Sequence, residues 1–319
     1  MTRSPRPHAW LAGGALAVAA GLLAGCASGP PPTEPVLADD FADPDVVQTD
    51  EGYWAYSTES NRQTVPTAFS EDLVTWERRG DAMPELPSWV IPGKTWAPEV
   101  TALAPDRFAL YFTATDFESG RQCIGVAISA EAGGPFEVQG DGMLVCPAED
   151  GGAIDASTAV IDGQRWLVWK NDGNAVGVDT WIQAAPLTDD GLALDGETVR
   201  LIRQDQAWEG ELVEAPTLVV HDEGLTLLYS ANSYGGDQYA IGYATAPSMD
   251  GPWTKAEEPL LTTAATGDEV RGPGGQDVVG APDGSARLIF HGWDPSYTYR
   301  SLHVAPLEWD GLEPVVGIG

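Results

Sequence analysis

The chain has 319 residues, of which 48 are Asp or Glu and only 16 are Lys or Arg, so its formal net charge is −32. This charge argues against binding to nucleic acid and against electrostatic attachment to anionic lipid, because both partners would repel the protein. It suits a soluble, exported protein.

The first 26 residues predict an export signal. Arg3 and Arg6 precede an apolar run over 10–23, which is too short for a comfortable membrane-spanning helix and is followed by small residues. The segment ends in Leu-Ala-Gly-Cys, which resembles a bacterial lipobox with Cys26 as the lipidated N-terminus. The alternative is an ordinary secretory signal with a chance cysteine. The lipobox predicts a protein anchored to the bacterial cell envelope, with membrane contact only through the lipid.

Residues 27–38 include four prolines and predict a semi-rigid tether. The remaining residues, 39–319, show no second break in composition, so we expect one large domain that acts as a monomer. Two cysteines remain after Cys26, namely Cys123 and Cys146. In an oxidising compartment such an even pair predicts a disulfide, and two buried free thiols are the alternative.

The domain consists of short alternating or apolar runs separated by Gly, Pro, Asp and Asn, which predicts an all-β fold. One pattern recurs five times, with spacings of 55, 58, 59 and 61 residues. Its repeats begin at Tyr53, Phe108, Trp166, Leu225 and Ala286. We expect one short strand before each repeat and two after it, and four strands repeated five times are typical of a five-bladed β-propeller. A β-sandwich also has many short strands but does not need this period.

In a propeller the first strand of each blade lines the central channel, and the second strand runs antiparallel to it. The start of each first strand therefore lies at the same channel mouth as the end of each second strand. Counting back about eleven residues from each repeat gives five positions at this mouth. They are Asp43, the segment 97–99, Asp155, Glu214 and Gln276. Three carboxylates are thus expected to converge at one end of the channel.

Two carboxylates that face each other across a gap supply the acid and the base that glycoside hydrolysis needs. Asp43, at a strand start, is expected to stay ionised and act as the base. Glu214, among apolar neighbours, is placed for a raised pKa and for the role of acid, and Asp155 would raise that pKa further by like-charge repulsion. Taken singly, each acid is better explained as a turn cap, but the matched positions favour a shared site. Four other aspartates are expected to be turn residues: Asp45, Asp162, Asp172 and Asp222.

Further polar and aromatic side chains are expected at the same mouth. Lys170 and Asn171 end one second strand, His291 and Trp293 end another, and Trp96 lies in a connection on that face. Flat aromatic rings suit the apolar face of a sugar. His291 is expected either to line the channel and hold water or a cation, or to be a hydrogen-bonded core histidine. No other histidine cluster or Cys-X-X-Cys motif in the sequence predicts a transition-metal site.

Together these motifs resemble those of glycoside hydrolase family 43, and the similarity runs over nearly all of 40–319. Four segments carry it: FADPDVV (41–47), WAPEV (96–100), GGAIDAS (151–157) and VEAPTL (213–218). The resemblance implies a five-bladed propeller that inverts configuration at the anomeric carbon. It also implies that Asp43 is the general base, Asp155 the residue that modulates the pKa of the acid, and Glu214 the general acid.

One position departs from the family pattern. Gln276 stands where many members have a histidine after glycine in the fifth blade. Because that histidine often holds a metal ion or water, its role is absent here or falls to Gln276 or His291. The resemblance therefore implies no required cofactor, assigns no metal ligand, and leaves a structural calcium ion in the channel open.

The resemblance implies removal of α-L-arabinofuranosyl units first, and β-D-xylosyl units next, from plant-type polysaccharides or oligosaccharides. The sequence does not choose between them, because a few hydrogen bonds from variable loops distinguish the two pentoses. The expected substrate-binding side chains are Trp96, Lys170, Asn171, Gln276, His291 and Trp293. The alternative is a non-catalytic carbohydrate-binding lipoprotein on the same scaffold. The presence of all three acids favours the enzyme.

Overall fold

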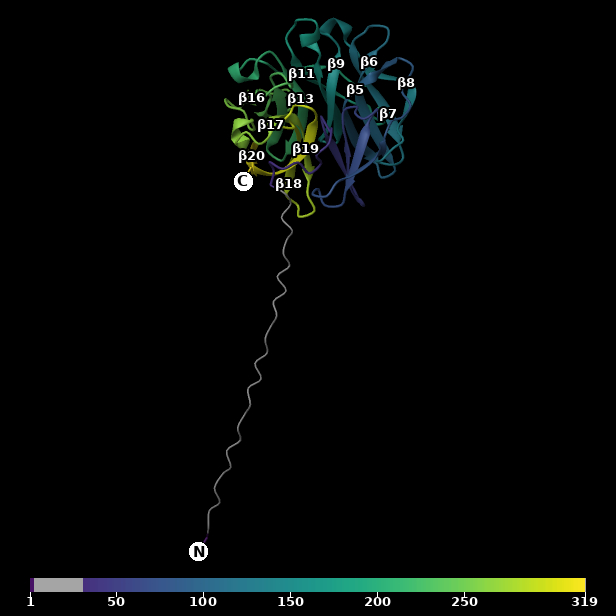
Figure 1. Cartoon of the computed structure of the whole chain (residues 1–319). Coiled ribbons are helices and arrows are strands. Elements are labelled where there is room, and N and C mark those ends of the chain that lie inside the picture. Colours follow the sequence, from purple (N-terminus) through teal and green to yellow (C-terminus); the bar gives the residue numbers. More distant parts are fainter. Residues whose placement is uncertain (3–30, 319) are drawn as a thin grey trace.

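The computed structural model describes residues 1–2 and 31–318 and is a β-propeller of five blades (Figure 1). Each blade is a four-stranded antiparallel sheet with its strands in chain order. The prediction of an all-β, five-bladed propeller is therefore confirmed. Nearly all of the predicted export signal, including Cys26, lies outside the described residues.

Blade 1 contains β1 (Asp45–Thr49), β2 (Gly52–Tyr56), β3 (Pro66–Ser70) and β4 (Glu77–Asp81). Blade 2 contains β5 (Val90–Ala104), β6 (Arg107–Asp116), β7 (Gln122–Ser129) and β8 (Glu137–Val145). Blade 3 contains β9 (Ala153–Ile161), β10 (Gln164–Asn171), β11 (Trp181–Pro186) and β12 (Val199–Arg203). Blade 4 contains β13 (Val213–His221), β14 (Gly224–Ala231), β15 (Ala240–Ala246) and β16 (Thr254–Lys255). Blade 5 contains β17 (Arg271–Gly280), β18 (Ala286–Trp293), β19 (Arg300–Asp310) and β20 (Glu313–Val316). Short 3-10 helices lie in the connections: η1 (Ala148–Asp150), η2 (Gly173–Ala175), η3 (Ala207–Glu209) and η4 (Ala264–Thr266).

Hydrophobic clusters hold the blades together, one at each interface between neighbouring blades. Between blades 1 and 2, for example, Tyr56 packs in one cluster with Phe108 and Phe112. Because each sheet is covered on both faces, its middle strands are largely buried. Every residue of β14 is buried, which explains the mostly apolar run that begins at Leu225.

The chain bends at a matching position in each blade, directly before β1 and within β5, β9, β13 and β17. Five residues at matching positions have a positive φ: Asp43 (50°), Ala97 (40°), Asp155 (56°), Ala215 (48°) and Gly275 (56°). This left-handed conformation costs about 1–2 kcal/mol for a residue other than glycine. At Gly275 a Cβ atom would lie 2.6 Å from the ring of His291 and 2.9 Å from Oδ1 of Asp43, so glycine is required there. The bend recurs in all five blades and marks the channel mouth.

Glu214 does not occupy the repeated position that counting from the sequence predicts. It lies one residue before Ala215, which is the blade 4 equivalent of Asp43. The pairing of β13 with β14 shifts register between Glu214 and Thr217, as a β-bulge does. Bulges change the direction of side chains near the end of a strand. Glu214 therefore reaches the channel mouth from a neighbouring position.

The described part of the predicted tether, residues 31–38, runs along blade 5. The N–H of Val36 donates to the carbonyl of Leu302 at 2.9 Å, and the N–H of Leu302 donates to the carbonyl of Leu37 at 3.1 Å. Nδ1 of His303 lies 3.2 Å from the carbonyl oxygen of Pro32. Within the described residues, no helix combines the length and the apolar character that crossing a bilayer requires.

Cys123 and Cys146 are joined by a disulfide, with their Cα atoms 4.6 Å apart. The bond links β7 to the segment that follows β8 in the same blade. Gln122, next to the first cysteine, pairs with Gly152 just before β9. The disulfide therefore lies where blade 2 meets the start of blade 3.

Candidate active site

A cavity of about 450 Å³ opens at the channel mouth where the first strands begin. All five blades contribute to its lining. The lining residues are Asp43, Thr58, Trp96, Ile154, Asp155, Lys170, Asp172, Asn174, Ala175, Leu212, Glu214, Ser233, Tyr234, Tyr239 and Arg300. The structure thus brings together five of the residues expected at the site: Asp43, Trp96, Asp155, Lys170 and Glu214.

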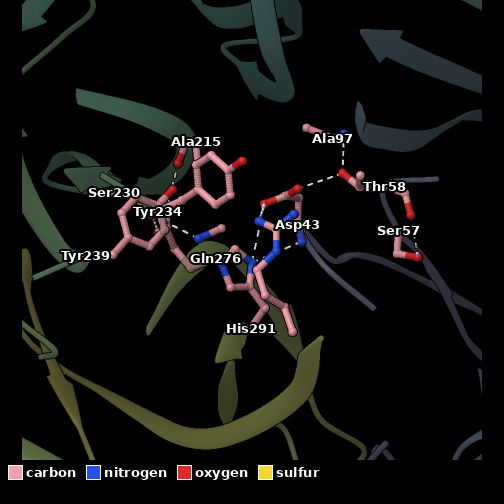
Figure 2. A network of polar contacts seen from close by, with 12 residues as sticks. Asp43, Ser57, Thr58, Ala97, Ala215, Ser230, Tyr234, Tyr239, Gln276 and His291 are labelled. Atoms are coloured by element: carbon pink, nitrogen blue, oxygen red, sulfur yellow. Dashed lines mark hydrogen bonds and ion pairs between the residues drawn. The ribbon is translucent and has the colours of Figure 1, made fainter. Parts of the chain in front are cut away.

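Asp43 is held on both of its carboxylate oxygens (Figure 2). Oδ2 accepts a hydrogen bond from Oγ1 of Thr58 at 2.6 Å, and Oδ1 accepts one from Nη1 of Arg300 at 3.0 Å. Thr58 in turn accepts a hydrogen bond from the N–H of Ala97 at 2.9 Å. Burial acts to raise the pKa of Asp43, but the charge of Arg300 and the hydroxyl of Thr58 hold that pKa below its ordinary value. Asp43 is therefore an ionised carboxylate near neutral pH.

Glu214 contacts polar side chains instead of the apolar neighbours expected from the sequence. Oε1 accepts a hydrogen bond from the hydroxyl of Tyr239 at 2.8 Å, and Oε2 lies 3.3 Å from Nζ of Lys170. The ammonium group also donates to Oδ1 of Asn174 at 2.7 Å and lies 3.5 Å from Oδ1 of Asp172. The bulge in β13 accounts for the difference, because it directs the carboxylate toward the end of β10. Asp172, expected only as a turn residue, lines the cavity.

Asp155 interacts with the charge of Glu214 and with the backbone of the next residue, Ala215. Oδ2 of Asp155 accepts a hydrogen bond from the N–H of Ala215 at 2.9 Å, and its own N–H donates to Oγ1 of Thr113 at 3.1 Å. Burial and, next, the negative charge of Glu214 raise the pKa of Asp155 to about 8. The like-charge interaction expected from the sequence is therefore present, and it acts on Asp155. Near neutral pH Asp155 therefore keeps its proton.

His291 and Gln276 lie beneath the cavity and do not line it. Nδ1 of His291 accepts a hydrogen bond from the N–H of Asp43 at 3.0 Å, and burial lowers the pKa of this histidine to about 3. Nε2 of Gln276 donates to the carbonyl of Ala215, and Oε1 accepts a hydrogen bond from Oγ of Ser230 at 2.8 Å. Both side chains support the backbone below the mouth. Of the two interpretations of His291, the structure shows a buried, neutral, hydrogen-bonded histidine.

Asn171 and Trp293 are also absent from the cavity lining. The amide nitrogen of Asn171 donates to two loop carbonyls, at 3.2 and 3.1 Å. Nε1 of Trp293 donates to the carbonyl of Tyr234 at 2.7 Å, and its ring lies 5.7 Å from Cζ of Arg300. These two residues fix loops and side chains around the mouth.

Three cavity residues that hydrogen-bond to Asp43 or Glu214 were not expected from the sequence: Thr58, Tyr239 and Arg300. Arg300 begins β19, and Tyr239 directly precedes β15. Both strands are the third of their blades, and third strands begin at the end where second strands finish. The propeller topology therefore places Tyr239 and Arg300 at the mouth, although no sequence motif marks them.

A second set of carboxylates lies two residues farther along the first strands, beside a cavity of about 40 Å³. We call Asp43, Asp155 and Glu214 the mouth carboxylates, and Asp45, Glu99 and Asp277 the inner carboxylates. Each inner carboxylate accepts a hydrogen bond from the next blade: Asp45 from Val100 N–H (2.8 Å), Glu99 from Thr158 N–H (2.8 Å) and Asp277 from Val46 N–H (2.9 Å). The expectation that Asp45 is a turn residue is therefore wrong, because it is buried in β1.

Burial raises the pKa of all three inner carboxylates. The pKa of Glu99 rises to about 7 and that of Asp277 to about 6. The pKa of Asp45 lies well above its ordinary value, because the charges of Glu99 and Asp277 add to the effect of burial. No cation is paired with this set among the described residues, so protons offset part of its charge.

Gln276 and His291 do not supply the ligands of the calcium ion that the sequence left open. Both ends of the Gln276 amide are bonded within the protein, and His291 has only a nitrogen free, whereas calcium takes six to eight oxygen ligands. Among the described residues, only Asp116, Cys123 and Cys146 bring three ligand atoms within 4.8 Å of one another, and these cysteines are bonded to each other. No step proposed below passes through a metal.

Comparison with known proteins places the site in context. The family model of the glycosyl hydrolases family 43 matches residues 32–312. A β-D-galactofuranosidase of Aspergillus niger is 28% identical over 288 residues, which are 85% of this chain and 78% of that protein. The α-L-arabinofuranosidase 43 of Humicola insolens is 26% identical, and the match covers 91% of this chain but 62% of that protein.

A solved structure shows the same fold. The endo-1,4-β-xylanase from Bacteroides thetaiotaomicron superimposes with a TM-score of 0.75 and is 28% identical in sequence. The match covers 89% of this chain and 96% of the xylanase chain.

Proposed function

The chain belongs to glycosyl hydrolase family 43 and is a glycoside hydrolase, and we propose that it removes pentosyl units by a single inverting displacement. The proposed units are α-L-arabinofuranosyl first and β-D-xylosyl next, from plant-type polysaccharides or oligosaccharides. The names of the relatives support a small sugar in the cavity, since they include an arabinofuranosidase and a xylanase.

The observation that carries this proposal is the contrast between the carboxylates in one cavity. Arg300 holds the pKa of Asp43 low, whereas burial and the charge of Glu214 raise the pKa of Asp155 to about 8. Carboxyl groups whose surroundings push their pKa values apart are the acid and base of a glycosidase. Asp43 is accordingly the base, and we assign the role of acid to Glu214, which lines the same cavity beside the protonated Asp155.

The proposed reaction is a single displacement. The oxygen of a water molecule attacks the anomeric carbon while a proton of that water passes to Asp43. The bond from the anomeric carbon to the glycosidic oxygen breaks, its electron pair stays on that oxygen, and the oxygen takes a proton from Glu214. Lys170 and the hydroxyl of Tyr239 then stabilise the carboxylate left on Glu214. Water enters opposite to the leaving group, so the configuration inverts.

Hydrolysis of three nitrophenyl glycosides by the mature protein tests the substrate class. We expect the highest kcat/KM on the α-L-arabinofuranoside, a lower one on the β-D-xyloside, and the lowest on the β-D-galactofuranoside. An enzyme that prefers the galactofuranoside would contradict the pentosyl proposal.

Proton NMR of the anomer first released tests the displacement, and net retention would contradict the roles given to Asp43 and Glu214.

We also propose that the protein is exported as a monomer and anchored through a lipid on Cys26. The motif before Cys26 and the net charge of −32 support this location. Metabolic labelling with radioactive palmitate in a bacterial host should label the full chain and not Cys26→Ser. Equal labelling of both chains would contradict the anchor.

A further inference from the structure

An exposed tyrosine lies in the loop that also supports the proposed acid. The loop between β14 and β15 carries Tyr234 and Tyr239, and both line the cavity. Tyr239 is buried, and its hydroxyl donates to Oε1 of Glu214. The side chain of Tyr234, in contrast, is 53% exposed. One loop thus supports the proposed acid with one ring and presents another ring to the solvent beside it.

The ring of Tyr234 is fixed in place. Cζ of Arg300 lies 5.1 Å from its centroid, so one region of the ring is covered. The carbonyl of Tyr234 accepts the hydrogen bond from Nε1 of Trp293, which anchors the backbone. Farther along the loop, Asp237 pairs with Arg271 at 3.0 Å. Because these contacts order the loop before substrate arrives, binding to the exposed part of the ring costs little conformational entropy.

The chemistry of the reaction determines which sugar meets this ring. The acid protonates the glycosidic oxygen, so the sugar that leaves with that oxygen must lie on the side of Glu214. We propose that Tyr234 is the stacking surface for the leaving-group sugar and therefore determines the preference for a saccharide on that side. An aromatic ring binds the apolar face of a sugar without selecting its hydroxyl pattern. This inference rests on the proposed acid role of Glu214.

A purely structural role for Tyr234 predicts a different result. If the ring served only to hold Arg300, its loss would disturb Asp43 and slow the hydrolysis of every substrate alike. Two substrates with the same pentosyl group separate these cases. A pentosyl fluoride has no leaving-group sugar, whereas a disaccharide has one.

The test compares kcat/KM on the disaccharide with kcat/KM on the fluoride. For Tyr234→Ala we expect this ratio to fall by about three- to tenfold, the size of an aromatic stacking contribution. Tyr234→Phe, which keeps the ring, should restore the wild-type ratio. Phe117→Ala is the matched control, because Phe117 is 77% exposed, follows β6 in blade 2 and does not line the cavity.

Parallel losses on both substrates in Tyr234→Ala would overturn the proposal in favour of support for Arg300. An unchanged ratio, or the same fall in Phe117→Ala, would also overturn it. If the wild-type enzyme hydrolyses no pentoside, the proposed function fails, and the same ratio is measured with the galactofuranosyl pair. The two failures are therefore distinguishable.

Discussion

The mouth and inner carboxylates share one channel but have opposite surroundings. The mouth set borders a cavity of about 450 Å³ and has two cations beside it, Lys170 and Arg300. The inner set borders cavities of about 40 and 300 Å³ and has no cation paired with it among the described residues, and each member accepts a backbone hydrogen bond from the next blade. Asp43 and Asp45 belong to different sets although only Pro44 separates them.

The difference shows that surroundings, and not residue type, decide what a carboxylate does in this channel. A cation nearby keeps Asp43 ionised and able to take a proton, whereas burial without a cation keeps protons on the inner set. Two residues along a strand are enough to move a side chain from a substrate cavity to the joint between two blades. The inner carboxylates are therefore structural.

The largest expected effect separates Asp43 from Asp45. Asp43→Asn removes the proposed base while preserving the shape of the side chain, so kcat should fall by about 10²–10⁴ on every substrate. Asp45→Asn should lower kcat by less than about tenfold, because this residue does not line the large cavity. Steady-state kinetics with circular dichroism as a folding control measure both. Equal losses of kcat would contradict the division into two sets.

Within the mouth set, the roles of Glu214 and Asp43 are separable by leaving group. Glu214→Ala should slow the hydrolysis of an unactivated disaccharide by at least about 10² more than that of an aryl glycoside. The reason is that a good leaving group needs little protonation. Asp43→Asn is the control, since it should slow both substrates equally. Equal losses on both substrates for Glu214→Ala would show that Glu214 is not the acid.

The sequence predicted the fold well because a propeller repeats in sequence as it does in space. The spacing of Tyr53, Phe108 and the later repeats was sufficient to place the blades. Asp43 and Asp155 were located because they occupy the repeated position itself. The surroundings of Glu214 were predicted wrongly, as apolar. A bulge changes the direction of the side chain, and counting residues does not reveal a bulge. The contact with Lys170 depends on that bulge.

The inner set was missed for a different reason. Asp45 follows a proline and was interpreted as a turn residue, and Glu99 ends the segment 97–99 that was expected at the mouth. The hydrogen bonds that hold both carboxylates come from other blades. A residue that bonds across an interface gives no local signal. Arg300 and Tyr239 lie at the starts of third strands, which the propeller topology places at the mouth. Neither residue belongs to a sequence motif that marks it.

The pH dependence of stability provides an intermediate effect. The pKa of Glu99, about 7, is above its ordinary value of 4.5, so its contribution to stability is full below pH 4.5 and is lost as pH rises through 7. The loss is of the order of 3 kcal/mol at about 1.4 kcal/mol for each pKa unit. The lowered pKa of Asp43 has the opposite sign, and its contribution is lost as pH falls below 3.8.

Glu99→Gln tests this dependence, because glutamine keeps an acceptor for Thr158 and does not titrate. Denaturant unfolding at pH 5 and at pH 8 gives the free energy of unfolding at each pH. This free energy should decrease less from pH 5 to pH 8 for Glu99→Gln than for the wild type. A decrease of the same size in both proteins would mean that Glu99 does not bind the proton in the folded state.

The smallest expected effect compares the inner positions of blades 3 and 4, which carry hydroxyl groups instead of carboxylates. Oγ1 of Thr217 donates to the carbonyl of Gln276 in blade 5 at 2.6 Å, whereas Oγ of the buried Ser157 has no partner among the described residues. Thr217→Val keeps the shape but leaves a buried carbonyl unpaired, so it should lower the free energy of unfolding by about 1–2 kcal/mol. Ser157→Ala removes a hydroxyl that makes no bond, and it should change the same quantity by less than about 0.5 kcal/mol or increase it. Urea unfolding measures the free energy of unfolding of both variants, provided that the m-value is unchanged. If Ser157→Ala lowered this free energy as much as Thr217→Val, blade 3 would also be joined to its neighbour through the hydroxyl of Ser157.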